Sequence, residues 1–342
     1  MNSTTSALQV QLLQELIHGN WTTLAIKAAI ELGVFDTLGQ GPADVRTLAN
    51  RLGVQPDPLA RLLQALVTLD LCAAEPDEHF LLTSMGGLLI DGAPGSLQPW
   101  ARFWAGPTAE LWRDLSESVV HGKSLRQIRQ GTIGFEHLDN DAERAKDFNA
   151  AMTSISDWVA RSFAATVDLT SAGRIVDVGG GHGELLVHAL RSNTRLHGTL
   201  FDLPHAAANA PAYLASHGLA DRVEIVGGDF FEGVPGGADV YVLKSVLHNW
   251  ADEHGLKILR NCRAAMTPAR RLFIVERMMP DAVASTAADR EVVRSDLNML
   301  VALNARERTA TRYQDMLLAA GFEFTAVTPL TMQYSAMEAR AF

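Results

Sequence analysis

The sequence of 342 residues has only two cysteines, Cys72 and Cys262, and no excess of basic charge. Two cysteines cannot supply the disulfide framework of a small secreted domain. Lys and Arg number 29 against 39 Asp and Glu, which gives a net charge of −10. Nucleic-acid phosphates and anionic lipids repel so acidic a surface. The composition therefore argues against nucleic acid and membranes as partners.

Long apolar runs are also missing. No stretch reaches the roughly 20 apolar residues of a membrane-spanning helix. Residues 1–14 carry no side-chain charge, so the basic start of a secretory signal is absent. The hydrophobic share of 47% and charged share of 20% are ordinary for a packed protein. We expect a cytoplasmic protein of two domains.

The spacing of apolar residues changes near residue 168. Before this point it is mostly helical, and beyond it β-branched runs alternate with helical segments. Strands are predicted at 174–178, 197–203, 222–226, 239–244 and 271–276, and helices at 183–192, 205–217, 252–266 and 309–320. This alternation is typical of a mainly parallel sheet covered by helices. We expect domains at 1–168 and 169–342.

Residues 43–83 have the pattern of a winged helix. Helices are predicted at 47–54 and 56–70, followed by a hairpin over 71–84 that turns around Pro76 and Asp77. A winged helix either binds DNA or serves packing and dimerisation. The segment has three basic and six acidic residues, the wrong sign for DNA. We favour packing or dimerisation.

The strongest local motif is DVGGGHG, from Asp177 to Gly183, between a predicted strand and a predicted helix. Glycines permit positive φ and a close approach of the backbone to a ligand. A phosphate-binding loop is one interpretation, but neither the P-loop nor the G-x-G-x-x-G spacing is present. Asp177 would repel a pyrophosphate, so the motif favours a cationic ligand.

Acidic residues also stand at the ends of the next two predicted strands: Asp202 closes the strand at 197–203, and Asp229 comes shortly after the strand at 222–226. Ligands of open parallel sheets bind at the carboxyl ends of the strands. A carboxylate at Asp202 can accept hydrogen bonds from both ribose hydroxyls, and Asp229 with Phe230 can bind an adenine. Asp at a strand end is also a common turn residue, but three at successive strand ends favour a nucleoside ligand.

Five motifs in this order, DVGGGHG, FDLP, GGDFF, LKSVLHNWADE and RERT, resemble the S-adenosylmethionine-dependent small-molecule O-methyltransferases. That family includes caffeic-acid and acetylserotonin enzymes, and the resemblance is greatest to the bacterial antibiotic-tailoring branch of phenazine type. It implies an α/β fold with a Rossmann-like class I methyltransferase domain and a mainly parallel seven-stranded sheet. It also implies an all-helical, winged-helix-like N-terminal dimerisation domain, and hence a homodimer.

The resemblance further implies S-adenosylmethionine as the cofactor, S-adenosylhomocysteine as its product, and a set of site residues. The implied cofactor contacts are Asp177, Gly179, Gly180, Gly181, Asp202, Leu203, Asp229, Phe230, Lys244 and Ser245. His248 corresponds to the general base, and Glu276 and Glu307 to the carboxylates that flank it. A phenol with a pKa near ~10 is mostly protonated at neutral pH, so a base accelerates its methylation.

Acceptor contacts are expected on two helical segments, near 141–166 and 296–309, and in the aromatic stretch before them. The candidates are Phe103, Trp104, Phe148, Met152, Asn249, Asp296, Asn298 and Met299. The apolar ones fit a core role equally well. Asn249 departs from the family, which usually has Asp after the base. Because the sequence has neither HExxH nor paired CxxC, we expect activity without a metal.

Two alternatives stay open. The same fold also serves N- or C-methylation and non-methyl chemistry, which His248, Glu276 and Glu307 argue against. A winged-helix regulator that senses S-adenosylmethionine is the other, and the acidic segment 43–83 argues against it. No motif encodes the acceptor, so phenazine, polyketide and simple phenol all remain candidates.

Overall fold

The computed structural model describes residues 6–76, 79–132, 134–135 and 141–342. Contacts within the chain divide it into two compact units, one of residues 1–110 with 150–154 and the other of residues 111–149 with 155–342. The boundary expected at residue 168, between dimerisation and cofactor binding, stays a prediction. Among the described residues, none of the helices combines the length and the apolar character needed to cross a membrane.

The first unit is mostly helical, with one small antiparallel sheet of order β1-β3-β2. Its elements are α1 (Ala7–Ile17), α2 (Gly19–Glu31), α3 (Val34–Leu38), β1 (Ala43–Asp44), α4 (Val45–Leu52), α5 (Pro56–Thr68), β2 (Cys72–Ala74), β3 (His79–Leu82), α6 (Ser84–Gly87) and α7 (Gln98–Ala105). Helices α4 and α5 and the β2–β3 hairpin confirm the winged-helix prediction. The unit is therefore helical apart from this sheet. Asp77, one of the two residues at which the hairpin is predicted to turn, lies outside the described residues.

Local sequence explains where these helices begin. The side chain of Asp44 caps α4 by accepting a hydrogen bond from the backbone nitrogen of Thr47, 2.9 Å away. Helix α5 begins with Pro56, whose fixed φ suits the first helical turn. Buried side chains such as Phe35, Leu48 and Leu63 form the core.

The second unit is built on a sheet of order β10-β11-β8-β7-β4-β5-β6, and β9 pairs with β8 at one end. Its strands are β4 (Arg174–Val178), β5 (His197–Asp202), β6 (Val223–Gly227), β7 (Val240–Lys244), β8 (Arg271–Met279), β9 (Arg308–Thr309), β10 (Phe322–Pro329) and β11 (Tyr334–Ala341). Strands β4 to β8 pair in parallel, whereas β11 runs antiparallel to β8 and β10. The five predicted strands and the mainly parallel sheet are confirmed.

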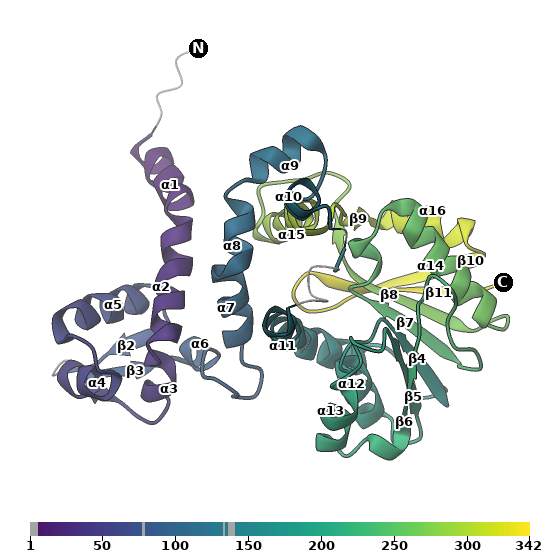
Figure 1. Ribbon diagram of the computed structural model, residues 1–342, viewed down its shortest axis with the longest axis horizontal. Coiled ribbons are helices and arrows are strands. Elements are labelled where there is room, and N and C mark those ends of the chain that lie inside the picture. Colours follow the sequence, from purple (N-terminus) through teal and green to yellow (C-terminus); the bar gives the residue numbers. More distant parts are fainter. Residues whose placement is uncertain (1–5, 77–78, 133, 136–140) are drawn as a thin grey trace, which may run out of the picture. The chain divides into compact units, whose positions relative to one another are not determined.

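The helices beyond α7 are α8 (Pro107–Trp112), which spans the division between the units, and α9 (Leu115–His121), α10 (Leu125–Gln130), α11 (Ala142–Thr166), α12 (Glu184–Ser192), α13 (Ala210–Ser216), α14 (Asp252–Ala265), α15 (Ala287–Leu303) and α16 (Ala310–Ala319). Helices α12 and α13 lie on one side of the sheet, and α14 and α16 on the other (Figure 1). The core on the α14 side includes the buried rings of Tyr241, Tyr313 and Phe322. The carboxyl ends of β4, β5 and β7 thus bring the predicted site residues to one edge.

Candidate active site

The glycine-rich turn joins β4 to α12 in a conformation that needs glycine. Gly179, Gly181 and Gly183 have φ of +73°, +57° and +91°, which side-chain-bearing residues rarely adopt. A Cβ on Gly180 would lie 2.7 Å from Asp177 Oδ2 and 2.8 Å from Leu200 Cδ1. The turn therefore packs its backbone tightly over the end of the sheet.

Asp177 is a buried carboxylate at the end of β4, with only 1% of its surface exposed. Its Oδ2 has no hydrogen-bond partner among the residues that the structure describes. Burial raises its pKa to about 7, although the positive charge of Lys244 acts in the opposite direction. In its ionised form, a buried carboxylate of this kind stabilises a cation placed beside it.

Asp202 connects the ends of β4 and β5. Its Oδ2 accepts a hydrogen bond from the backbone nitrogen of Gly181 at 2.8 Å, and its Oδ1 accepts one from Leu203 at 2.7 Å. Burial raises the pKa of Asp202, and these backbone donors partly offset that rise. Leu203 itself is 38% exposed, so an apolar side chain stands open beside this carboxylate.

Asp229 and Phe230 follow β6. Asp229 is exposed, and its Oδ1 accepts a hydrogen bond from the backbone nitrogen of Phe231 at 2.8 Å. The half-buried ring of Phe230 lies edge-on to Phe231 and Trp250, with centroids 5.0 and 6.0 Å away. Asn261 donates a hydrogen bond to the carbonyl of Phe230 at 2.8 Å. The surroundings thus fix Phe230 in place.

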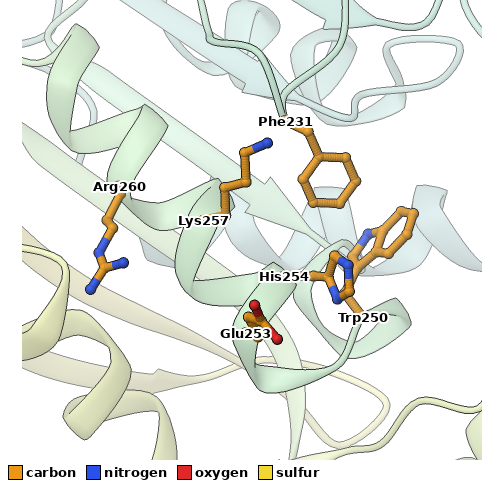
Figure 2. Close-up of a pocket in the computed structure, with 6 residues that line it drawn as sticks. All are labelled: Phe231, Trp250, Glu253, His254, Lys257 and Arg260. Carbon is orange, nitrogen blue, oxygen red and sulfur yellow. The ribbon is translucent and has the colours of Figure 1, made fainter.

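A surface hollow of about 540 Å³ lies against this aromatic group, as Figure 2 shows. Its lining residues are Phe231, Trp250, Glu253, His254, Lys257 and Arg260. None of them is a predicted site residue. The hollow therefore flanks Phe230 without containing the residues that the sequence singles out.

Lys244 is the last residue of β7, and Ser245 follows it. Lys244 Nζ donates a hydrogen bond to Ser156 Oγ of α11 at 2.8 Å. Ser245 has a left-handed φ of +55°, and its Oγ lies 3.3 Å from the hydroxyl of Tyr334. This strained residue turns the chain into the short helix η4 (Leu247–Asn249), which carries His248.

Two buried glutamates face one nitrogen of His248. Nδ1 lies 3.0 Å from Glu307 Oε1 and 3.5 Å from Glu276 Oε2. Glu276 is fully buried and lies within β8, three residues before its end, rather than at its last residue as expected from the sequence. Its Oε1 accepts backbone hydrogen bonds from Val246, Leu247 and His248 at 2.9, 2.9 and 3.3 Å, which fixes η4.

Burial lowers the pKa of His248, but the charges of Glu276 and Glu307 more than offset this, so the pKa is raised. The positive charge of Arg277 acts against the two glutamates. Because the carboxylates accept from Nδ1, the neutral ring carries its hydrogen there. Nε2 is then the nitrogen with a free lone pair.

The predicted acceptor contacts have varied surroundings. In the second unit, Asn249 Nδ2 donates to the carbonyl of Ser245 at 2.9 Å, and Asp296 Oδ1 accepts from the backbone nitrogen of Glu307 at 2.8 Å. Asn298 Oδ1 accepts a hydrogen bond from Trp112 Nε1 at 3.3 Å. Met299 is buried, and the centroid of the Phe148 ring lies 5.6 Å from that of Phe135. In the first unit, the Phe103 and Trp104 rings are 5.7 Å apart, and Met152 is half-buried. Asn249 and Asp296 hold neighbouring backbone; acceptor contact by the whole set stays a prediction.

Sequence reasoning missed Ser295 and Arg277, which lie beside the base. Ser295 Oγ donates to Glu307 Oε1 at 2.6 Å, and Arg277 Nη1 donates to Ser295 Oγ at 3.3 Å. The sequence held one weak signal, a basic residue directly after Glu276 in an apolar strand. Ser295 precedes Asp296 in a helix, and serine there carries no distinguishing signal.

Within the part of the chain that the structure describes, two side-chain groups have metal-ligand chemistry: His248 with Glu276 and Glu307, and His188 with Asp157 and Glu184, each with donor atoms within 4.8 Å of one another. In the second group, His188 Nε2 lies 2.9 Å from Asp157 and 3.2 Å from Glu184. Both groups are already connected by internal hydrogen bonds. Independence from metal stays a prediction.

Residues 112–323 match the O-methyltransferase domain, and residues 14–91 match the O-methyltransferase dimerisation domain. The phenazine O-methyltransferase PhzM of Lysobacter antibioticus is 34% identical to this chain, over 96% of it and 95% of the relative. The 3-amino-4-hydroxybenzoate 4-O-methyltransferase of Streptomyces cremeus is 38% identical, over 96% and 89%. The crystal structure of human N-acetylserotonin methyltransferase in complex with SAM is similar with a TM-score of 0.89 and 25% identity, covering 100% of this chain and 99% of that one.

Proposed function

The chain belongs to the S-adenosylmethionine-dependent O-methyltransferases, and from that premise we propose that it methylates a hydroxyl group of a small aromatic acceptor with His248 as the general base. The observation that carries the base is the contact of His248 Nδ1 with Glu307 Oε1 at 3.0 Å. This contact leaves Nε2 to take the acceptor proton. The named substrates of the two bacterial relatives support an aromatic acceptor.

The residues of the β4, β5 and β6 ends fit the cofactor. Asp177 offers a buried carboxylate oxygen without a hydrogen-bond partner among the described residues, suited to the amino group of the methionine portion. A Cβ on Gly181 would meet nothing within 4 Å, so the turn has open space at this position. Asp202 would accept from the ribose hydroxyls, because each oxygen that takes a backbone donor has a second lone pair.

The remaining cofactor contacts complete this assignment. Asp229 and Phe230, with the exposed Leu203, would bind the adenine, and Lys244 and Ser245 would lie beside the methionine portion. When bound, S-adenosylmethionine supplies an electrophilic methyl group on a sulfonium. The glycine-rich turn would hold that group still while the acceptor approaches in line, and such alignment contributes several kcal/mol to catalysis, about 7–11 in the best cases.

The base acts through its second nitrogen. An acceptor hydroxyl placed at Nε2 loses its proton as the oxygen attacks, and the imidazole becomes positive between Glu276 and Glu307. Both glutamates are at least nine-tenths buried, so their charges are little screened by water. They stabilise the protonated ring more than the neutral one, which favours proton transfer from the phenol.

The acceptor residues belong to the proposal as well. Phe148, Asn249, Asp296, Asn298 and Met299 of the second unit and Phe103, Trp104 and Met152 of the first would contact the acceptor. We further propose a metal-free reaction, since the base removes the proton without help from a cation. Full activity after dialysis against excess chelator is expected, and a loss that added Mg²⁺ or Zn²⁺ reverses would contradict it.

A homodimer is proposed from the match to the dimerisation domain and from helix α1. In the structure this helix buries none of its residues, although six of its eleven are large and apolar and at least 49% exposed. An isolated helix of this length is marginal in water. A second copy of the chain is the natural cover for such a face.

His248→Ala tests the base. We expect the turnover of a hydroxylated phenazine or benzoate to fall by about 10²–10⁴-fold, while the Kd for S-adenosylhomocysteine, measured by calorimetry, changes less than about threefold. His254→Ala, an exposed histidine of α14, is the matched control and should keep full turnover. Survival of turnover in His248→Ala would show that another group takes the proton. Aromatic amines assayed in the same way measure whether the enzyme also methylates nitrogen.

A further inference from the structure

Arg277 is a buried arginine next to the base that the proposed reaction does not use. It follows Glu276 on β8, and only 8% of its side chain is exposed. Its guanidinium stacks on the ring of Tyr334, 4.8 Å from the centroid. Its ion-pair partner Glu291 is 3.4 Å away but half exposed. A buried guanidinium is costly unless nearby negative charge compensates it, and one exposed partner is weak compensation.

Ser295 connects this arginine to the carboxylate of the base. A serine hydroxyl has a single hydrogen, and Ser295 lies within 2.6 Å of Glu307 Oε1, which can only accept. Arg277 Nη1, 3.3 Å away, can only donate, so Ser295 accepts from it. The same Glu307 oxygen accepts from His248 Nδ1 at 3.0 Å. The donors thus run in one direction from Arg277 to Ser295 to Glu307.

The neighbouring residue of α15 fixes the backbone of Glu307. Asp296 Oδ1 accepts a hydrogen bond from the backbone nitrogen of Glu307 at 2.8 Å. Two consecutive residues of one helix therefore hold Glu307, one by its carboxylate and one by its main chain. This arrangement leaves the carboxylate little freedom to turn away from His248.

We propose that Ser295 and Arg277 are positioning residues for the general base: Ser295 holds the Glu307 carboxylate on His248 Nδ1, and Arg277 offsets the charge of the two glutamates so that the imidazole is neutral before it takes a proton. This inference rests on the proposed function of His248. Two buried carboxylates without a nearby cation would keep the ring protonated, and a protonated imidazole cannot act as a base.

The charges around His248 come from several elements. The groups that act on it, on its carboxylates or on the residues beside them are Glu276 and Arg277 of β8, Glu307, Arg306, Arg308 of β9, Lys244 of β7, Asp296 of α15, Tyr313 of α16 and Tyr334 of β11. Both tyrosines have raised pKa values, with burial as the main cause, and stay neutral. The positive charge of Arg277 acts to lower the pKa of both His248 and Glu307.

Loss of the Arg277 charge lets the pKa of His248 rise, so more of the base is protonated at a given pH. The acid limb of the kcat–pH profile should then move to higher pH. Loss of the Ser295 hydroxyl instead frees Glu307 to rotate, which should lower kcat at every pH with little change in cofactor affinity.

The test measures kcat against pH at saturating cofactor and acceptor for Arg277→Gln, Arg277→Lys, Ser295→Ala and Ser295→Thr. We expect Arg277→Gln to move the acid limb up by about 0.5–1 pH unit, or roughly 0.7–1.4 kcal/mol, and Arg277→Lys to leave it in place. Ser295→Ala should lose about tenfold in kcat, and Ser295→Thr should recover most of it. Calorimetry with S-adenosylhomocysteine confirms that each variant is folded.

Two outcomes overturn the inference: an acid limb in Arg277→Gln that coincides with that of the unmodified enzyme, or a Ser295→Ala enzyme with undiminished kcat. If Arg277→Gln binds no cofactor, the test depends on Arg277→Lys and the two serine variants. A kcat of Ser295→Thr that is no higher than that of Ser295→Ala then contradicts the proposal. His248→Ala separates this from a failure of the base itself, because a fully active His248→Ala would remove the proposed function as well.

Discussion

The carboxylate of Asp202 accepts a hydrogen bond from the backbone nitrogen of Gly181, 2.8 Å away, and so joins the end of β5 to the glycine-rich turn after β4. The residue proposed for the ribose therefore also holds the loop proposed for the methionine portion. Damage to one of these contacts should weaken both parts of the cofactor site together.

Asp202→Asn should weaken cofactor binding more than a lost ribose contact alone. Two backbone donors, Gly181 and Leu203, face the two oxygens of Asp202, and an amide offers only one oxygen to them. We expect the Kd for S-adenosylhomocysteine to rise about 10–100-fold, or roughly 1.4–2.8 kcal/mol, in calorimetry. Asp221→Asn, at an exposed residue, is the control. An unchanged Kd in Asp202→Asn would separate Asp202 from the cofactor.

Gly180→Ala should disrupt the turn without changing any polar group. The new Cβ would lie 2.7 Å from Asp177 Oδ2 and 2.8 Å from Leu200 Cδ1, so the backbone must move. Overpacking of this kind costs about 1–3 kcal/mol, and we expect a lower Tm together with weaker cofactor binding. Gly233→Ala is the matched control, because nothing lies within 4 Å of its Cβ. Equal behaviour of the two variants would contradict the tight packing.

Asp177→Asn should separate stability from binding. Burial raises the pKa of Asp177 to about 7, so the folded chain keeps a proton that the unfolded chain releases near pH 4. Stability is therefore lost as the pH rises from about 4 to 7, and above pH 7 the ionised carboxylate costs on the order of a few kcal/mol. Without cofactor, Asp177→Asn should unfold at a higher temperature than the unmodified protein at pH 8 and about the same temperature at pH 4.

Cofactor affinity should show the opposite effect. In the unmodified enzyme it should increase as pH rises through about 7, because the ionised carboxylate is the form that pairs with an ammonium group. Asp177→Asn should bind more weakly and lose this pH dependence. Calorimetry at pH 6 and 8 measures both. A variant that is less stable at pH 8 and binds normally would reverse the assignment.

The strands that bear the cofactor residues could be predicted because their sequences favour one structure at every position. β4 reads RIVDV, and its last four residues are buried, so a β-branched run leads directly to Asp177. Strand β11 was missed for the opposite reason. The β11 sequence YSAMEARA contains three alanines and a glutamate, which disfavour strands. Only its pairing with β8 and β10 makes it a strand.

The base could be located from sequence only in part. The position of His248 after a buried strand marks it, but Glu307 lies 59 residues away, and nothing in the spacing connects them. Their contact exists because β9 pairs with the end of β8 and brings the segment before it to η4. Ser295 and Arg277 depend on the same packing, so local pattern could not reveal them.

Arg308 should be essential to the loop that carries His248. It is 2% exposed and donates to the carbonyls of Leu247 and Trp250 at 2.8 and 2.5 Å and to Asp252 at 2.7 Å. Arg308→Lys cannot make three bonds in this fixed geometry. We expect a loss of about 2–3 kcal/mol of unfolding free energy and a lower kcat.

The control for Arg308 is Arg312, which contacts the same Asp252 at 2.6 Å but has a half-exposed side chain. Exposed ion pairs contribute about 0–1 kcal/mol, so Arg312→Lys should be nearly neutral in denaturant unfolding. Similar losses for the two substitutions would mean that the Asp252 ion pair, and not the buried carbonyl contacts, is what Arg308 supplies.

The apolar face of α1 should control the oligomeric state. Leu12, Leu13 and Leu16 are 50%, 57% and 62% exposed, and helix α1 has no buried residue in the structure. A charge introduced at such a face opposes burial in an interface without disturbing the core of the chain. Leu12→Asp with Leu16→Asp should therefore give a monomer of about 37 kDa in light scattering at micromolar concentration, where the unmodified chain is expected at twice that mass.

Val119→Asp with Val120→Asp, at residues of α9 that are 64% and 76% exposed, is the matched control and should leave the dimer intact. If the α1 variant keeps the mass of the dimer, the contact between copies lies elsewhere, and α1 must be covered in another way.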